Sequence, residues 1–283
     1  MYLTNTNGFI KYEFINRNVL KYIVIVLMLF DHISYLFPLD NPAVAYIGFI
    51  SRLTAPTMAL SIAEGYHYTR NVKKYMKRLL IFAVISYIPY VLYRTENILP
   101  IQLFSGQSTP MFYREAGAVL IEPNIFIKAI NSVLVIHETS VIFTLFLGLC
   151  TIYLWDKVKI SKYLKLAITL LILWISAFSN WQYILILLCL IFYFLKENPK
   201  KMWFAFSIVA LLYIFTVRIF ANPFAPAFTM DFVPFKIGIF LVPLFFMCYN
   251  GKAGNKSSFN KWFFYIFYPA HLLALGIIRL LIC

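Results

Sequence analysis

The chain has 283 residues, of which 62% are hydrophobic, 19% aromatic and 13% charged, with a mean hydropathy of +0.78. This composition leaves too little polar surface for a soluble globule and excludes a cytosolic enzyme, a disordered chain and a collagen-like repeat. The net charge of +14 reflects 25 Lys and Arg against 11 Asp and Glu, and no basic stripe on a polar domain points to nucleic acid. We therefore expect an all-α, polytopic transmembrane helical bundle.

Apolar segments long enough to cross a bilayer follow one another along most of the chain. A spanning helix needs about 20 apolar residues, and about nine segments, within a range of eight to ten, meet this length. They lie near residues 18–37, 48–68, 76–93, 134–155, 163–179, 181–197, 202–220, 233–249 and 262–282. A tight hairpin at Ser179-Asn180 is predicted between the fifth and sixth, and the eighth contains Lys236, Pro234 and Pro243.

The positive charges indicate which side of the membrane each loop faces. Eighteen of the 25 Lys and Arg fall within residues 11–21, 70–78, 157–165, 196–201 and 252–261, all on one side of the predicted spans. Because cytoplasmic loops are enriched in Lys and Arg, we expect a cytoplasmic amino-terminal tail at 1–17 and a single membrane domain at 18–283. An extracytoplasmic loop is expected at about 94–131, and the carboxyl terminus is expected outside.

Several ionisable residues lie inside the predicted spans. Each costs about 2.5–3.5 kcal/mol at the bilayer centre and therefore calls for a partner or a function. They are Asp31 and His32 in the first span, Arg52, Glu64 and His67 in the second, and His271 in the ninth.

Helical spacing relates Lys21 to three of these residues, Asp31, His32 and Arg52. Lys21 and His32 are almost three turns apart, so they share a helix face and lie about 16 Å apart along the axis. The first two spans are antiparallel, which puts His32 and Arg52 at similar depth. Asp31 projects about 100° away from His32, so we expect it to pair with Arg52 rather than to orient the imidazole.

Two of these patterns remain open to a structural or a functional interpretation. The Asp31–Arg52 pair fits either helix packing or a reaction centre. Glu64, His67, Arg70 and Asn71 form a polar strip that is either a helix end reaching for the membrane surface or the wall of a cytoplasmic ligand mouth. Neither the four isolated cysteines nor the histidine spacing forms a metal motif, so no metal is expected.

Specific motifs recur at both ends of the chain and between them. They are Leu20-Lys21 with Phe30-Asp31-His32, Ser51-Arg52-Leu53-Thr54-Ala55-Pro56, Gly65-Tyr66 with Tyr68-Thr69-Arg70-Asn71, Lys73-Lys74-Tyr75 with Arg78-Leu79, Ser140-Val141-Ile142-Phe143-Thr144-Leu145, and Lys261-Trp262-Phe263-Phe264-Tyr265 leading to Tyr268-Pro269-Ala270-His271-Leu272. By these motifs the chain resembles the TraX family of membrane acetyltransferases, whose founding activity is amino-terminal acetylation of conjugative pilin. It departs from the family at Ser140, where Asn is frequent, and in a longer segment from Arg94 to Asn131.

The resemblance implies an enzyme, an acyltransferase that uses acetyl-CoA, in a multi-pass protein of the bacterial cytoplasmic membrane. It implies that His32 is the catalytic histidine and that Arg52 lies beside the reaction centre. We include Asp31 and His271 in the catalytic set, with His271 expected to hold the acceptor or to assist proton movement. The residues expected to face the acetyl-CoA donor are Lys21, Arg70, Asn71, Lys73, Lys74, Lys77 and Arg78.

A neutral imidazole suits the role of general base at the thioester, with Arg52 offsetting charge on the oxyanion. Direct transfer is preferred to an acetyl-histidine intermediate. The acceptor is left open among an exported peptide such as pilin, a glycan and a small molecule, and specificity is expected in the 94–131 loop. The oligomeric state is also left open.

Two other classes of function remain. A proton-coupled transporter would use Asp31, His32, Glu64 and His67 as a relay, but the sequence gives no inverted repeat and no pair of broken helices to support it. An accessory subunit of a conjugation or secretion assembly would not need His32.

Overall fold

A computed structural model describes residues 14–34, 42–94, 139–215, 233–255 and 257–282. These ranges are all-helical, as predicted, and contain two isolated bridges in place of strands, Ile15 with Tyr249 and Thr139 with Ser179. The helices are α1 (Arg17–Ser34), α2 (Pro42–Ser51), α3 (Thr54–Tyr68), α4 (Val72–Ile85), α5 (Tyr87–Arg94), α9 (Val141–Asp156), α10 (Lys162–Ser176), α11 (Gln182–Phe194), α12 (Pro199–Phe215), α13 (Val233–Ile237), the 3-10 helix η2 (Gly238–Phe240), α14 (Leu241–Met247) and α15 (Ser258–Ile282).

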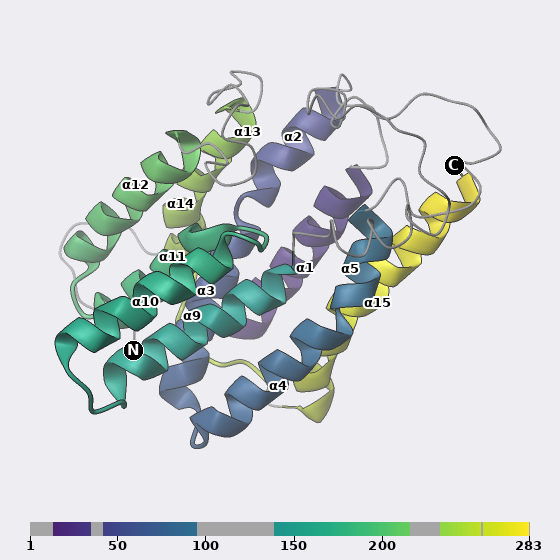
Figure 1. The fold of residues 1–283 in the computed structure, drawn as a ribbon. Helices are drawn as coiled ribbons and strands as arrows, with labels where there is room; N and C mark the ends of the chain where they lie inside the picture. The colour runs from purple at the N-terminus through teal and green to yellow at the C-terminus, as the bar shows by residue number, and fades with distance from the viewer. Residues whose placement is uncertain (1–13, 35–41, 95–138, 216–232, 256, 283) are drawn as a thin grey trace, which may run out of the picture.

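The bundle is built around α1, α3, α9 and α11, with α10 and α12 along one side and α5 beside α15 on another (Figure 1). Its core contains fully buried aliphatic side chains such as Leu149, Leu185 and Leu188. Gly148 lets α9 approach α11 closely, because a Cβ there would lie 2.8 Å from the sulfur of Cys189. The packing of α3 on α11 and of α4 on α9 holds the first third of the chain against the middle third.

Among the described residues, two helical stretches are long and apolar enough to cross a membrane, Ala43–Tyr68 along α2 and α3 and Val72–Arg94 along α4 and α5, and they match the second and third predicted spans. Gln182–Phe194, Phe235–Met247 and Trp262–Ile278 are shorter apolar helices. The total of about nine spans and the cytoplasmic amino terminus stay predictions. Most of the predicted tail at 1–17 and almost all of the 94–131 loop lie outside the described residues.

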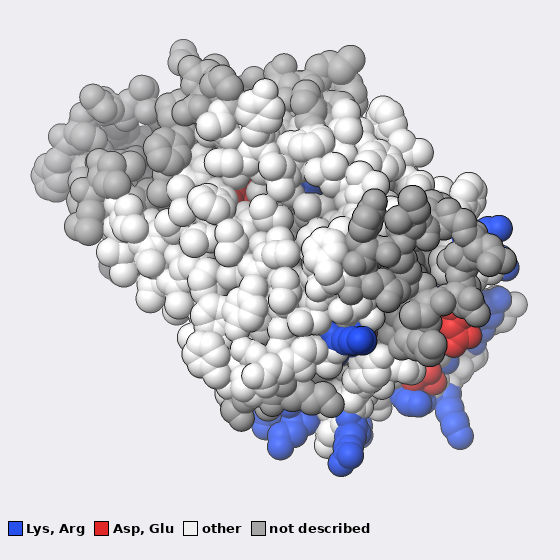
Figure 2. Space-filling model, turned by 180° about the vertical axis from the view of Figure 1, so that it is seen from behind, with Lys and Arg blue, Asp and Glu red and all other residues white. Residues whose placement is uncertain are grey.

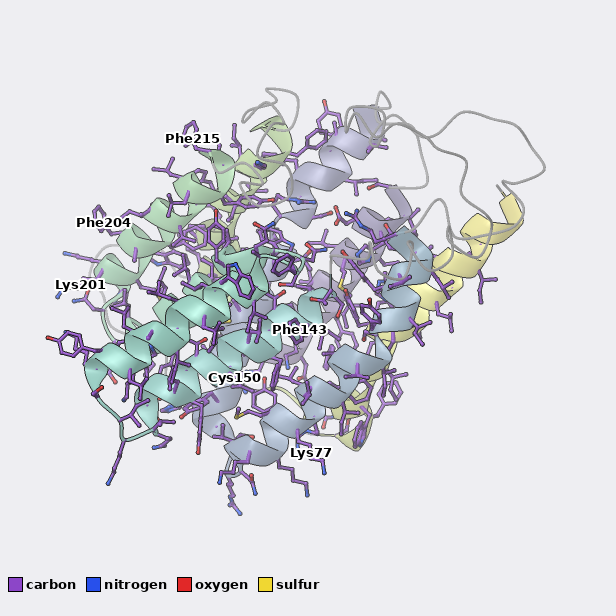
Figure 3. The ribbon with its side chains drawn as sticks, viewed as in Figure 1. Lys77, Phe143, Cys150, Lys201, Phe204 and Phe215 are labelled. Carbon is purple, nitrogen blue, oxygen red and sulfur yellow. The ribbon has the colours of Figure 1, made fainter. Side chains whose placement is uncertain are left out.

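The described surface separates apolar from charged side chains. On the face seen in Figure 2, Lys and Arg gather at one end of the bundle, and much of the remaining described surface carries no charge. We call this the basic end; α4 begins there (Figure 1), with Arg70, Lys73, Lys74 and Lys77 just before and in its first turns. Phe204 and Phe215 on α12 point away from the bundle (Figure 3) and are 70% and 61% exposed. An exposed apolar surface of this kind is what lipid-facing helices present.

Three of the predicted spans are divided, which corrects the expectation that the chain has no pair of broken helices. The second is divided at Arg52-Leu53 between α2 and α3, the third at Ser86 between α4 and α5, and the eighth into α13, η2 and α14. The second and the eighth pack on each other at Gly238, where a Cβ would lie 1.9 Å from the carbonyl oxygen of Phe49 in α2. Nothing larger than a glycine hydrogen fits between the two backbones.

This crossing generates a stability prediction. Gly238→Ala should lower the melting temperature of the detergent-purified protein, with a cost of about 1–3 kcal/mol, because overpacking forces the backbones apart. Gly276→Ala is the comparison, because its Cβ would lie 3.2 Å from the backbone of Leu92, a tight contact but a much longer one than at Gly238. A melting temperature of Gly238→Ala equal to that of the unmodified protein would show that the crossing tolerates a side chain.

Candidate functional site

A cavity of about 570 Å³ extends alongside α1 through the bundle. Its lining includes Arg17, Lys21 and Arg78 towards the basic end, and His32 and Arg52 towards the opposite end. An α-helix rises about 1.5 Å per residue, so Arg17 and His32 on α1 lie about 22 Å apart along the axis. The cavity therefore connects a cationic region with the predicted catalytic histidine.

His32 and His271 are hydrogen-bonded to each other. Nδ1 of His32 lies 2.8 Å from Nε2 of His271, and the rings are stacked with centroids 5.0 Å apart. Both side chains are buried, at 9% and 7% exposure. The hydrogen bond joins α1 to α15, so the structure brings two predicted catalytic residues together from opposite ends of the chain.

The backbone determines the tautomer of this pair. Nδ1 of His271 lies 2.8 Å from the carbonyl oxygen of Phe267, which can only accept, so His271 carries its proton on Nδ1. In neutral His271, Nε2 is then an acceptor, and His32 must donate to it from Nδ1. The proton of neutral His32 is thereby fixed on Nδ1, which leaves a lone pair on Nε2. No hydrogen bond to that Nε2 is found among the described residues, and His32 lines the cavity.

His271 thus contacts His32 and the Phe267 carbonyl and is not part of the cavity wall, and its predicted role in holding the acceptor or moving a proton stays a prediction. The backbone of His32 is held as well, because the hydroxyl of Tyr93 donates to its carbonyl oxygen at 2.8 Å. The ring of Tyr93 also meets the imidazole edge-on, with centroids 5.1 Å apart.

The predicted ion pair between Asp31 and Arg52 is present, with Nη2 of Arg52 2.9 Å from Oδ1 of Asp31. The guanidinium also donates to a carbonyl group that the helix break leaves without its backbone partner. Because the N–H of Arg52 bonds to Phe49, the carbonyl of Gly48 receives the Nε of Arg52 instead, at 2.9 Å. Nη1 donates to the Tyr213 hydroxyl at 3.1 Å. These hydrogen bonds hold the break between α2 and α3 in place, and a role for Arg52 beside the reaction centre stays a prediction.

The predicted hairpin between the fifth and sixth spans brings a strained aromatic residue to the cavity. Trp181 has a φ of 63°, and Gln182 follows with 39°, a left-handed conformation that is costly for a bulky side chain. The indole stacks on Tyr213 with centroids 4.7 Å apart and lies 5.6 Å from the Arg52 guanidinium. Asn180 and Trp181 both line the cavity, and the sequence assigned neither to the site.

The cavity near the basic end is lined by cations. Lys21 is on the cavity wall, as is His32, in keeping with their predicted common face, and its ammonium lies 5.1 Å from the centre of the Phe264 ring. Arg78 lines the same wall, and its buried Nε has no hydrogen-bond partner in the described ranges. Arg17 also lines it but pairs with Glu64. Of these three residues, Arg17 was not among those predicted to face the donor.

The predicted polar strip is divided between the inside and the outside of the bundle. Glu64 is buried, where it binds Arg17 and accepts from the Tyr249 hydroxyl at 2.8 Å. His67 is exposed beside Lys196, 3.2 Å from its ammonium. The proposed relay of Asp31, His32, Glu64 and His67 is therefore not assembled in the structure.

The other residues of the predicted donor site lie on the surface of the basic end. Asn71 caps α4, its side chain accepting from the N–H of Lys74 at 2.9 Å. Arg70, Lys73, Lys74 and Lys77 are exposed, and none is part of the cavity wall. Lys77 points away from the bundle (Figure 3). Donor contact by these residues stays a prediction.

The chain matches the model of the TraX protein family over residues 16–104 and 119–279. It is also 28% identical, over 259 residues, to the probable fimbrial assembly protein FimC, serogroup H1, of Dichelobacter nodosus. This match covers 90% of the chain and 92% of the relative. No solved structure shows significant similarity to the chain.

The tautomer assignment is open to direct measurement. In protein labelled with ¹⁵N-histidine and studied at a pH where the pair is neutral, NMR should find both His32 and His271 protonated on Nδ1, because the Phe267 carbonyl fixes the direction of the hydrogen bonds. His271→Ala should give a mixture of tautomers at His32. The exposed His67 serves as the internal comparison, and a proton on Nε2 of His32 in the unmodified protein would contradict the assignment.

Proposed function

Because the chain belongs to the TraX family, we propose that it is a membrane acyltransferase that moves an acetyl group from acetyl-CoA to an amine or hydroxyl of an exported acceptor. The observation that carries this proposal is the His32–His271 pair, which presents an unprotonated imidazole nitrogen in a long cavity. A nitrogen of this kind is the general base that acyl transfer to an amine or hydroxyl requires.

The cationic part of the cavity suits the acyl donor. Acetyl-CoA carries several phosphate charges at one end and a slender arm that ends in the thioester. In this proposal Lys21 and Arg78 receive phosphate oxygens, and the unpartnered Nε of Arg78 is a donor available for one of them. The arm then follows α1 towards His32, across the separation of about 22 Å between Arg17 and His32 that the helix rise gives.

The chemistry proceeds by direct transfer. The acceptor N–H or O–H attacks the thioester carbonyl, a bond forms between the acceptor atom and the carbonyl carbon, and Nε2 of His32 takes the acceptor proton. The C–S bond then breaks, and the proton on Nε2 returns to the departing thiolate, which gives CoA. While His32 is protonated, its Nδ1–H donates to Nε2 of His271 and stabilises the imidazolium.

The membrane location is part of the proposal. The exposed apolar side chains of α10 and α12, among them Trp174 and Phe204, form the lipid-facing surface of a multi-pass protein. The basic end then faces the cytoplasm, where acetyl-CoA is available, and the opposite end faces the exported acceptor.

The acceptor is an exported peptide, a glycan or a small molecule. The Dichelobacter nodosus relative is named as a fimbrial assembly protein, which supports a pilus subunit among the peptides. The same name also fits an assembly subunit without catalysis, so an experiment at His32 must separate the two functions.

A proton-coupled transporter is the second candidate. The interrupted helices α2–α3 and α13–η2–α14 cross at Gly238, and broken helices that meet are typical of transporter binding sites. Against it, Glu64 and His67 lie apart from the Asp31–His32 region. Solute uptake into proteoliposomes without any acetyl transfer would favour the transporter.

The first functional prediction concerns the base. His32→Ala should lower acetyl transfer by about 10²–10⁴-fold, because it removes the proton acceptor, while membrane insertion is retained. The measurement uses labelled acetyl-CoA, purified membranes and the exported fraction of a host strain that lacks the protein. Undiminished transfer in this variant would contradict the catalytic role, and pilus assembly that needs the protein but not His32 would favour an assembly subunit.

The second functional prediction concerns the donor site. Two neighbouring residues on α4, Arg78 and Lys77, offer a matched pair of variants. Arg78→Gln should raise the KM for acetyl-CoA more than kcat changes, because it removes a cationic group from the cavity wall. Lys77→Gln removes the same charge from a side chain that points away from the bundle. Similar KM values for the two variants would show that the charge of the basic end, rather than the cavity wall, binds the donor.

A further inference from the structure

We propose that Tyr268 is a catalytic residue of this transfer, whose hydroxyl donates a hydrogen bond to the oxyanion formed at the thioester carbonyl. The inference rests on the proposed acyltransferase function. It adds a hydrogen-bond donor for the oxyanion, which His32 as a base does not supply. Acyl transfer needs a donor where negative charge develops, and that donor must be held in place before the reaction.

Tyr268 lies where such a donor is needed. It is 4% exposed, lines the cavity and is one turn from His271 on α15. Its ring meets both imidazoles edge-on, with centroids 6.5 Å from His32 and 5.6 Å from His271. A carbonyl that reaches Nε2 of His32 through the cavity therefore comes close to this phenol.

The hydroxyl of Tyr268 lies near the beginning of α9. Val141, the first residue of that helix, lines the same cavity, and the side chain of Ser140 precedes it. The buried Oγ of Ser140 makes no hydrogen bond among the described residues. No hydrogen bond of the Tyr268 hydroxyl is found in the described ranges either, so its proton is available to a ligand.

Arg52 is less suited to this task than the sequence suggests. Its nitrogens bond to Asp31, Tyr213 and the Gly48 carbonyl, and these bonds hold the break between α2 and α3. An oxyanion would have to share Nη1 or Nη2 with these partners. The Tyr268 hydroxyl makes no such bond among the described residues and can donate its proton without giving one up.

In the reaction step, the acceptor proton moves to Nε2 of His32 as the new bond forms at the carbonyl carbon. The π electrons of the carbonyl move to its oxygen, which accepts the hydrogen bond from Tyr268. The phenol keeps its proton throughout. When the C–S bond breaks, the charge leaves the oxygen and the proton on His32 goes to the thiolate.

Tyr268→Phe removes the hydroxyl and keeps the ring against both histidines. We expect kcat for labelled acetyl transfer to fall by about 10²–10³-fold, with little change in the KM for acetyl-CoA. Binding of CoA itself, measured by calorimetry, and the rate at which diethyl pyrocarbonate modifies His32 should stay as in the unmodified protein. Tyr66→Phe is the matched control, because it removes a buried hydroxyl that bonds to Asp156 at 2.7 Å and does not line the cavity.

The outcomes separate this inference from the function on which it rests. If His32→Ala abolishes transfer while Tyr268→Phe keeps the unmodified kcat, the role of Tyr268 is wrong and the acyltransferase stands. If the unmodified protein transfers no acetyl group, the proposed function fails and this inference fails with it.

A second variant tests the role of the hydroxyl if Tyr268→Phe fails to fold. Tyr268→3-fluorotyrosine keeps the ring and the hydroxyl. A phenol donor predicts that this variant keeps kcat close to that of the unmodified enzyme at neutral pH, where Tyr268→Phe loses it. A kcat as low as that of Tyr268→Phe would overturn the inference.

Discussion

The hydrogen bond between Nδ1 of His32 and Nε2 of His271 is the interaction on which the candidate site depends. Its direction follows from the Phe267 carbonyl, which accepts from His271 and cannot donate. In many hydrolases a carboxylate holds a catalytic histidine by its second nitrogen. Here a neutral histidine takes that position, which spares a buried region the cost of a further charge. The nearby carboxylate of Asp31 is instead used by Arg52.

Along the cavity, the buried carboxylates are paired and two of the cations are not. Glu64 and Asp31 each have an arginine partner, Arg17 and Arg52 respectively. Lys21 and Arg78 line the wall with no ion pair to a carboxylate among the described residues, which leaves a local excess of positive charge. An anion that enters the cavity therefore meets cations whose charge is not already compensated, and this favours an anionic ligand over a neutral solute.

Helical periodicity predicted the parts of the site that involve neighbouring or antiparallel helices. The common face of Lys21 and His32 and the Asp31–Arg52 pair follow from residues per turn and from similar depth in adjacent spans. The contact between His32 and His271 spans 239 positions, and its formation depends on how α15 packs against α1. The left-handed backbone of Trp181 and the bond from Arg52 to the Gly48 carbonyl also depend on tertiary packing. The sequence predicted Arg78 and Lys77 together as donor-facing residues, and the packing of α4 separates them, because Arg78 lies beside the buried Tyr75 and Leu79 whereas Lys77 is exposed.

The joining of the two ends of the chain has a consequence for biosynthesis. Ile15 forms a backbone bridge with Tyr249, the N–H of Arg17 bonds to the carbonyl of Lys252, and His32 finds its partner at His271. A ribosome makes α1 first and α15 last, so Asp31 and His32 are in place long before the helix that completes the pair. Chains that terminate early would contain the cationic wall of α1 and α4 without the histidine that orients the base. In the proposed acyltransferase, the base would be oriented only after α15 has been made and has packed against α1.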